Sequence, residues 1–204
     1  GRQVIAPTPG SGEAYDALAA RLASVSPAGA TPTAASLRAV LQLLPKLAPP
    51  VHVLLATDGA PSCGTTPCAS SACTYNLEGR SLGLLACDAT TNCCDPAYAS
   101  AGLGVSACID GDATAAAAAE LVRAGARVFV LGVPGTVPAY RDTLEASARA
   151  GGASRYFEAT EPGELEGGHG VGRLADALLL REDPADHELG DAAHGELLDR
   201  IGAD

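Results

Sequence analysis

The stretch Val51 to Gly59, VHVLLATDG, decides how the rest of this chain is interpreted. Apolar residues occupy five of its first six positions, which predicts a strand buried on both faces of a parallel sheet. The apolar run stops at Thr57-Asp58-Gly59, so the carboxylate of Asp58 is expected at the carboxyl end of the strand. Ligands of open α/β sheets bind at that edge, and Asp58 is therefore a candidate functional residue.

Helices and strands alternate on both sides of this strand. A helix with an apolar face opens at Thr31-Pro32-Thr33, and Thr33 is placed to cap it. The other predicted elements are a helix over 12–24, a helix over 115–123 capped by Asp112 or Thr114, a helix beginning at Pro138, and strands over 127–133 and 155–159. Such alternation is typical of a parallel sheet with crossover helices, so we predict an α/β fold.

Composition narrows the class of protein. The 204 residues suffice for one domain with its own core. Apolar residues make up 47% of the chain and aromatic residues only 3%, so we expect a core of Leu, Val and Ala. The net charge of −11 argues against a nucleic-acid or anionic-membrane partner, and no apolar run reaches the ~20 residues that span a bilayer. Because the chain contains no methionine, we expect a processed product or a fragment.

All cysteines of the chain lie in one segment. Zinc sites usually contain C-x-x-C pairs or nearby histidines. The spacing of these cysteines contains no C-x-x-C pair, and no histidine lies among them. We therefore predict disulfides in an exported protein, with a zinc cluster as the alternative. The chain has seven cysteines, an odd number, so one thiol is free or its partner lies outside this chain. The disulfide candidates are Cys63, Cys68, Cys73, Cys87, Cys93, Cys94 and Cys108.

The cysteines mark an insertion within one domain. Residues 1–160 are predicted to form this domain, and residues 60–112, rich in Cys, Ser, Thr, Gly and Asn, form a long insertion inside it. Loops of this size are uncommon in compact domains unless they are functional or cross-linked. Residues 161–180 are predicted to contain a closing helix, and residues 181–204 form a polar tail that is either ordered or disordered.

The threonine loop, the strand ending in T-D-G and the LGVPG segment at 131–135 together resemble the von Willebrand factor type A (vWA) domain. The similarity covers about residues 29–160, and its last part, LEASARAGGASRYFEAT at 144–160, looks like the family's last helix and strand. The resemblance implies a Rossmann-like, doubly wound, mostly parallel sheet flanked by helices. The family's D-x-S-x-S motif is absent, and its place would be upstream of Gly1, together with the first strand or strands.

The resemblance also assigns a metal site. In the vWA family the first threonine of this loop ligates the metal, and the T-D-G aspartate usually acts through water. These roles fall on Thr31 and Asp58 in this sequence. A hydroxyl and a carboxylate suit Mg²⁺, Ca²⁺ or Mn²⁺, which prefer oxygen ligands. Without the aspartate and serines of D-x-S-x-S, we expect weak or no metal binding by this chain.

The implied function is cation-dependent adhesion by an exported, bacterial-type protein in an extracytoplasmic location. An acidic side chain of a protein ligand would complete the metal coordination. The insertion leaves directly after Asp58-Gly59, so we expect it to overhang the site and influence partner choice. The alternatives are a metal-free, disulfide-stabilised scaffold of a surface protein and a hydrolase that uses Asp58 with a histidine. No G-x-S-x-G, Walker or G-x-G-x-x-G motif occurs, so we predict no enzyme.

Overall fold

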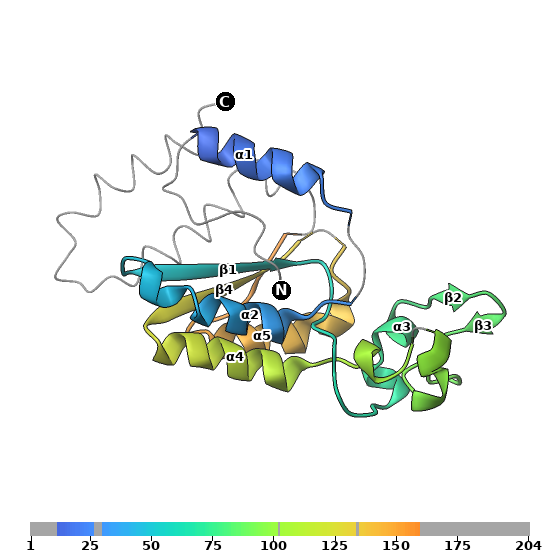
Figure 1. Cartoon of the computed structure of the whole chain (residues 1–204). Helices are drawn as coiled ribbons and strands as arrows, with labels where there is room; N and C mark the ends of the chain where they lie inside the picture. The colour runs from blue at the N-terminus through green and yellow to red at the C-terminus, as the bar shows by residue number, and fades with distance from the viewer. Residues whose placement is uncertain (1–11, 27–29, 102, 134, 160–204) are drawn as a thin grey trace.

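The computed structural model describes residues 12–26, 30–101, 103–133 and 135–159 (Figure 1). The predicted closing helix at 161–180 and the polar tail at 181–204 lie outside these residues. Among the helices that the structure describes, none has both the length and the apolar character needed to cross a membrane.

Three parallel strands form the sheet at the centre of the molecule. Their order is β1 (Val51–Thr57), β4 (Ala126–Gly132) and β5 (Phe157–Glu158). β1 and β4 pair along their whole length, with Val51 opposite Ala126 and Thr57 opposite Gly132. β5 is short and pairs only with the end of β4. The parallel pairing agrees with the predicted α/β fold, although the sheet is small.

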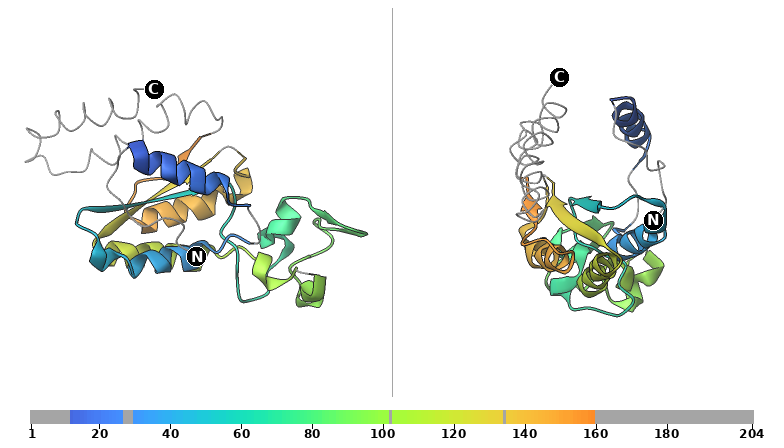
Figure 2. Two further views of the ribbon diagram at one scale, coloured as in Figure 1. Left: turned by 45° about the horizontal axis from the view of Figure 1, so that its top comes forward. Right: turned by 90° about the vertical axis from the view of Figure 1, so that its left-hand side faces the viewer.

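Helices α2 (Thr33–Leu41), α4 (Gly111–Arg123) and α5 (Arg141–Ala150) cover one face of the sheet (Figure 1). α4 packs against both α2 and α5. Helix α1 (Gly12–Ala23) lies on the other side of the sheet (Figure 2), and its Leu22 side chain is 55% exposed. Because a doubly wound sheet has helices packed on both faces, the described residues support a helix-flanked parallel sheet without the doubly wound arrangement.

The core between the sheet and these helices consists of small and aliphatic side chains. Leu121 of α4 and Val128 of β4 are fully buried, and the buried Ala117 and Ala118 let α4 approach its neighbours closely. Gly151 follows α5 and lies directly on β4, since a Cβ atom there would be 2.6 Å from the carbonyl oxygen of Val128. Tyr140, which directly precedes α5, is buried too, as are Leu144 and Ala148 of α5.

β1 differs from its prediction, because only one of its faces is buried. Its side chains alternate between partly buried and exposed positions along the strand. His52 and Ala56 are exposed, and Leu54 between them is 51% exposed. β1 is an edge strand of the described sheet, and α2, α4 and α5 all lie on the opposite face from these three side chains. The predicted burial on both faces is therefore wrong for the described residues.

Two helices begin differently from their predictions. α4 begins at Gly111, four residues early, so Thr114 lies in its first turn and its hydroxyl donates to the carbonyl oxygen of Asp110 at 2.8 Å. Pro32 rather than Thr33 occupies the N-cap position of α2, and no side chain caps that end. The buried Thr33 is the first helical residue, and its hydroxyl donates back to the carbonyl oxygen of Thr31.

The predicted insertion forms a separate lobe between β1 and α4, which we call the cysteine lobe and define as residues 60–110. It lies beyond the carboxyl end of β1 (Figure 1). Its two strands form an antiparallel hairpin, with Gly83 at the turn in the left-handed conformation. The elements of the lobe are η2 (Ser70–Ala72), α3 (Thr74–Leu77), β2 (Ser81–Leu82), β3 (Leu85–Ala86), η3 (Pro96–Ala101) and η4 (Val105–Ala107); η1 (Leu44–Lys46) and η5 (Pro138–Tyr140) lie outside it.

The prediction of disulfides is confirmed. The pairs are Cys68–Cys108, Cys73–Cys94 and Cys87–Cys93, and Cys63 is the free cysteine. Cys68–Cys108 joins the two ends of the lobe across 40 residues of sequence. In the chain-entropy model, closing a loop of that length stabilises the fold by about 4 kcal/mol. Bonded cysteines also make up most of the buried members of the lobe's own hydrophobic cluster, which explains how a segment with few large apolar residues forms a core.

We expect iodoacetamide to modify one cysteine of the unreduced protein, Cys63, because the other six are bonded. Peptide mapping by mass spectrometry identifies the modified residue and the three linked peptide pairs. A Cys63→Ser variant should take up no label, and labelling of any other cysteine before reduction would contradict the pairing.

We expect Leu121→Ala to lower the free energy of unfolding by about 2–5 kcal/mol, because it leaves a cavity beneath α4 where the side chain is now 0% exposed. Leu84→Ala is the matched control, since Leu84 is fully exposed and should change stability by no more than about 0.5 kcal/mol. Urea denaturation of both variants measures the difference, and equal stabilities would show that Leu121 is not part of the core.

Candidate functional site

The structure brings Thr31 and the turn that carries Asp58 together at the carboxyl edge of the sheet. β1 ends at Thr57, and a Cβ atom built on Gly59 would lie 3.7 Å from the Thr31 hydroxyl oxygen. The Thr57 hydroxyl shapes the turn, because it donates to the Gly59 carbonyl oxygen at 2.9 Å and accepts from the Gly59 N–H at 3.2 Å. The Asp58 side chain is exposed, so the turn whose Gly59 lies next to Thr31 also presents a carboxylate to solvent.

Ser62 of the cysteine lobe fixes the position of Thr31. The Thr31 N–H donates to the Ser62 hydroxyl oxygen at 2.8 Å, and the Ser62 N–H donates to the Thr31 carbonyl oxygen at 2.9 Å. Ser62 is buried, with only 5% of its surface exposed. The two residues are 31 positions apart, so no local sequence pattern could have identified Ser62 as a partner.

A cavity of about 300 Å³ lies between the cysteine lobe and the Thr31 loop. Its walls combine two small residues, Gly59 at the sheet edge and Ala60 at the start of the lobe, with polar side chains of both parts. Asp58 is not among the lining residues. The polar side chains are Thr31, Ser62, Thr74, Tyr75, Glu78, Arg80 and Ser106. Of these residues only Thr31 belongs to a motif that the sequence offers, because the others lie in a segment without a recognisable motif.

Further contacts hold the cysteine lobe against the sheet domain. Leu77 and Ile109 of the lobe pack on the core cluster that includes Tyr140. The Tyr140 hydroxyl donates to the Glu78 carboxylate at 3.3 Å. Burial, followed by the nearby charge of Glu78 and this hydrogen bond, raises the pKa of Tyr140 to about 12. The expectation that the insertion overhangs the carboxyl edge therefore agrees with the structure.

Glu78 also orients Arg80, which lines the same cavity. The Arg80 guanidinium donates from Nε to Glu78 Oε2, and its central carbon lies 5.6 Å from the centre of the Tyr75 ring. The side chain remains 58% exposed, so the guanidinium is oriented without being enclosed.

The donor atoms at this edge meet only part of the requirement for a hard cation. Thr31 and Asp58 offer a hydroxyl and a carboxylate, which are suitable oxygen ligands. In the described part of the chain, one group of three His, Cys, Asp or Glu side chains has its donor atoms within 4.8 Å of one another, and it consists of Cys68, Cys94 and Cys108. All three are in disulfides and provide no thiolate, so this geometry does not support the zinc alternative.

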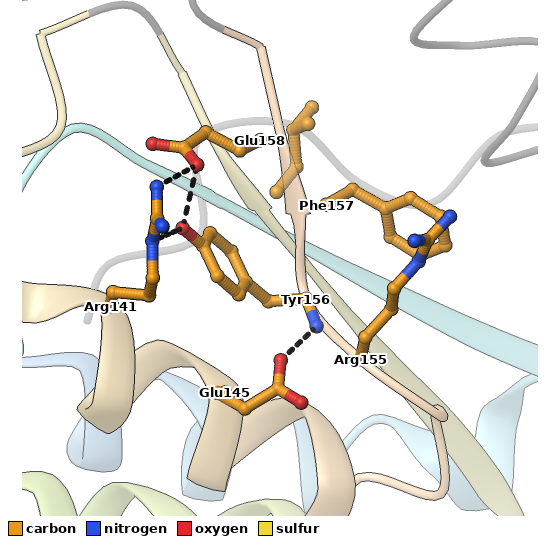
Figure 3. Close-up of a pocket in the computed structure, with 7 residues that line it drawn as sticks. Arg141, Glu145, Arg155, Tyr156, Phe157 and Glu158 are labelled. Carbon is orange, nitrogen blue, oxygen red and sulfur yellow. Dashed lines mark hydrogen bonds and ion pairs between the residues drawn. The ribbon is translucent and has the colours of Figure 1, made fainter. Parts of the chain in front are cut away.

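A second, more open cavity of about 420 Å³ lies beside β5 (Figure 3). Arg141 donates to the Tyr156 hydroxyl at 3.1 Å and to Glu158 at 2.7 Å, and the Tyr156 hydroxyl also donates to Glu158 at 3.0 Å. On the other side, the Tyr156 N–H donates to Glu145 at 2.9 Å, which lowers the pKa of that carboxyl. Because these charges pair with one another, we interpret the group as a tie between α5 and β5.

Comparisons with family models, with curated proteins and with solved structures return no match for this chain.

We expect an alkaline titration of tyrosinate absorbance to contain a late step near pH 12 that Tyr140→Phe removes. Folding favours the neutral phenol, so its contribution to the free energy of unfolding is fully present below the ordinary pKa of about 10 and is lost as the pH rises toward 12. Tyr98→Phe is the control and should keep the late step. Burial also raises the pKa of Tyr156, so the contradicting result is a late step that keeps its full amplitude in Tyr140→Phe.

Proposed function

We propose that this chain is a vWA-like, non-enzymatic binding domain that uses the carboxyl edge of its sheet to hold a protein ligand. The observation that carries the proposal is the closeness of the Thr31 hydroxyl to the Asp58-Gly59 turn, beside a polar cavity closed by the cysteine lobe. Ligands of open α/β sheets bind at this edge. The proposed ligand presents an acidic side chain.

In this proposal Thr31 and Asp58 supply oxygen atoms toward a divalent cation such as Mg²⁺, Ca²⁺ or Mn²⁺, and the cation attracts the ligand's carboxylate when it is bound. Ser62 keeps the Thr31 loop in place through two hydrogen bonds. The Thr57 hydroxyl shapes the turn that exposes Asp58. Only one carboxylate belongs to this pair, so we expect the chain alone to bind the cation weakly.

The disulfides support an extracytoplasmic location within this proposal. Three disulfides persist in oxidising compartments, such as the outside of the cell or the bacterial periplasm. We therefore place the binding domain in a secreted, periplasmic or cell-surface protein.

The second candidate function is a metal-free scaffold of a surface protein. The observation that favours it is the absence, among the described residues, of any cluster of carboxylates or histidines with ligand atoms close together. In that case the cysteine lobe and its disulfides would serve stability and spacing, and Asp58 would be an exposed turn residue.

Calorimetric titration with Mg²⁺ or Mn²⁺ separates the two functions. The cation-dependent function predicts a measurable heat of binding. Asp58→Asn should lower the apparent affinity for the cation about tenfold or more, because removing the carboxylate charge weakens binding of a hard cation. Asp16→Asn is the control, since Asp16 is an exposed carboxylate on α1, and should leave the titration unchanged.

The same titration on a product extended upstream of Gly1 tests whether further ligands complete the set. Heat that is stronger in the extended product and sensitive to Asp58→Asn supports the cation-dependent function. The absence of heat in both proteins would exclude it and leave the scaffold as the better account.

A further inference from the structure

Arg80 is the single basic residue of the cysteine lobe. No other Lys, Arg or His occurs between residues 60 and 110, and the whole chain carries a net charge of −11. Arg80 is therefore the one side chain of the lobe that carries a positive charge, and its ion-pair partner is Glu78. It lines the cavity that also contains Thr31 and Ser62, so it lies beside the proposed binding edge.

The contacts of Arg80 orient its guanidinium and leave part of it available. Nε donates to Glu78, and the central carbon of the guanidinium lies over the Tyr75 ring. Among the described residues, no acceptor is hydrogen-bonded to the two terminal nitrogens, and 58% of the side chain is exposed. Two terminal nitrogens in one plane match the two oxygens of a carboxylate.

Glu78 pairs with the Arg80 guanidinium through one oxygen, and its other oxygen accepts from a second donor. Tyr140 donates to Glu78 Oε1, while Arg80 binds Oε2. The carboxylate is therefore held on the sheet side by Tyr140 and acts as a positioning residue for the guanidinium. Tyr75 has the same positioning role, since a guanidinium over an aromatic face is attracted to it.

We propose that Arg80 is a binding residue for a carboxylate of the protein ligand, which its two terminal nitrogens hold in a bidentate arrangement. The inference rests on the proposed function, and it deepens it by assigning a second, metal-independent contact to the acidic ligand. The hydroxyls of Ser62 and Thr31 in the same cavity provide polar surroundings for the ligand group. The carboxylate is either a side chain or the carboxyl terminus of a chain, and these two sources share the recognised chemistry.

Short peptides titrated into the intact, isotope-labelled chain, followed by NMR in the presence of EDTA, test this inference without any metal. The probes are acetyl-Ala-Asp-Ala-amide, acetyl-Ala-Ala-Ala with a free carboxyl terminus, and acetyl-Ala-Asn-Ala-amide as the uncharged control. We expect the amide signals of Arg80, Ser62 and Thr31 to shift with a carboxylate peptide and not with the Asn peptide. The response to the first or the second peptide identifies the side chain or the chain terminus as the source.

The decisive comparison uses two arginine variants. Arg80→Gln should weaken binding of the responding peptide about tenfold or more, since it removes a charged, bidentate contact, and Arg80→Lys should restore only part of the affinity. Arg38→Gln is the matched control, because Arg38 is similarly exposed at 47% and pairs with Glu120 away from the cavity. Retained disulfides and an otherwise unchanged spectrum establish that each variant is folded.

Each outcome bears on the inference separately from the metal. Peptide binding that survives Asp58→Asn but is lost in Arg80→Gln supports the Arg80 contact, even when the cation titration gives no heat. Equal weakening by Arg38→Gln and Arg80→Gln would overturn the inference, because it would show unspecific charge attraction. Unchanged affinity in Arg80→Gln, or no response to either carboxylate peptide, would overturn it as well.

Discussion

The connection between two parallel strands is the constraint on which this structure depends. The chain leaves β1 at its carboxyl end and must return through α4 to the amino end of β4, yet residues 60–110 lie within that connection. The two ends of the lobe are therefore held side by side: Asp110 N–H donates to the Pro61 carbonyl at 2.8 Å, and Cys63 N–H donates to the Ser106 carbonyl at 2.7 Å. Cys68–Cys108 closes the same junction covalently. The sheet can thus pair in register although a whole lobe interrupts it.

This junction also determines what the carboxyl edge can bind. Because the lobe begins directly after Gly59, its first residues reach Thr31, and Ser62 joins the two segments. Glu78 and Tyr140 form a further contact between lobe and sheet domain. The polar cavity is formed jointly by the Thr31 loop, the turn that follows β1 and the lobe. Arg80 supplies a positive charge to this cavity. The exposed Asp58 in the neighbouring turn supplies a negative charge, so the edge carries both within an acidic chain.

Much of the fold could be predicted from local patterns. The spacing of apolar residues predicts both the strand at residues 51–57 and helix α2. This spacing involves only residues that are close together in the sequence. The burial of β1 could not be predicted in this way, because an apolar strand reads alike at the centre and at the edge of a sheet. The start of α4 was misplaced for a related reason: Gly111 is a poor helix former, and tertiary packing overrides this local preference.

The sequence by itself determined the order of strands and helices, the confinement of every cysteine to one segment, and the candidates Thr31 and Asp58. These properties depend on residue type and spacing alone. Only the tertiary structure decided which cysteines pair, that Ser62 binds Thr31, and that Arg80 lies at the same cavity. Each of these facts joins residues that are far apart in the chain, and such contacts are set by packing of the lobe against the sheet, which local sequence patterns do not encode.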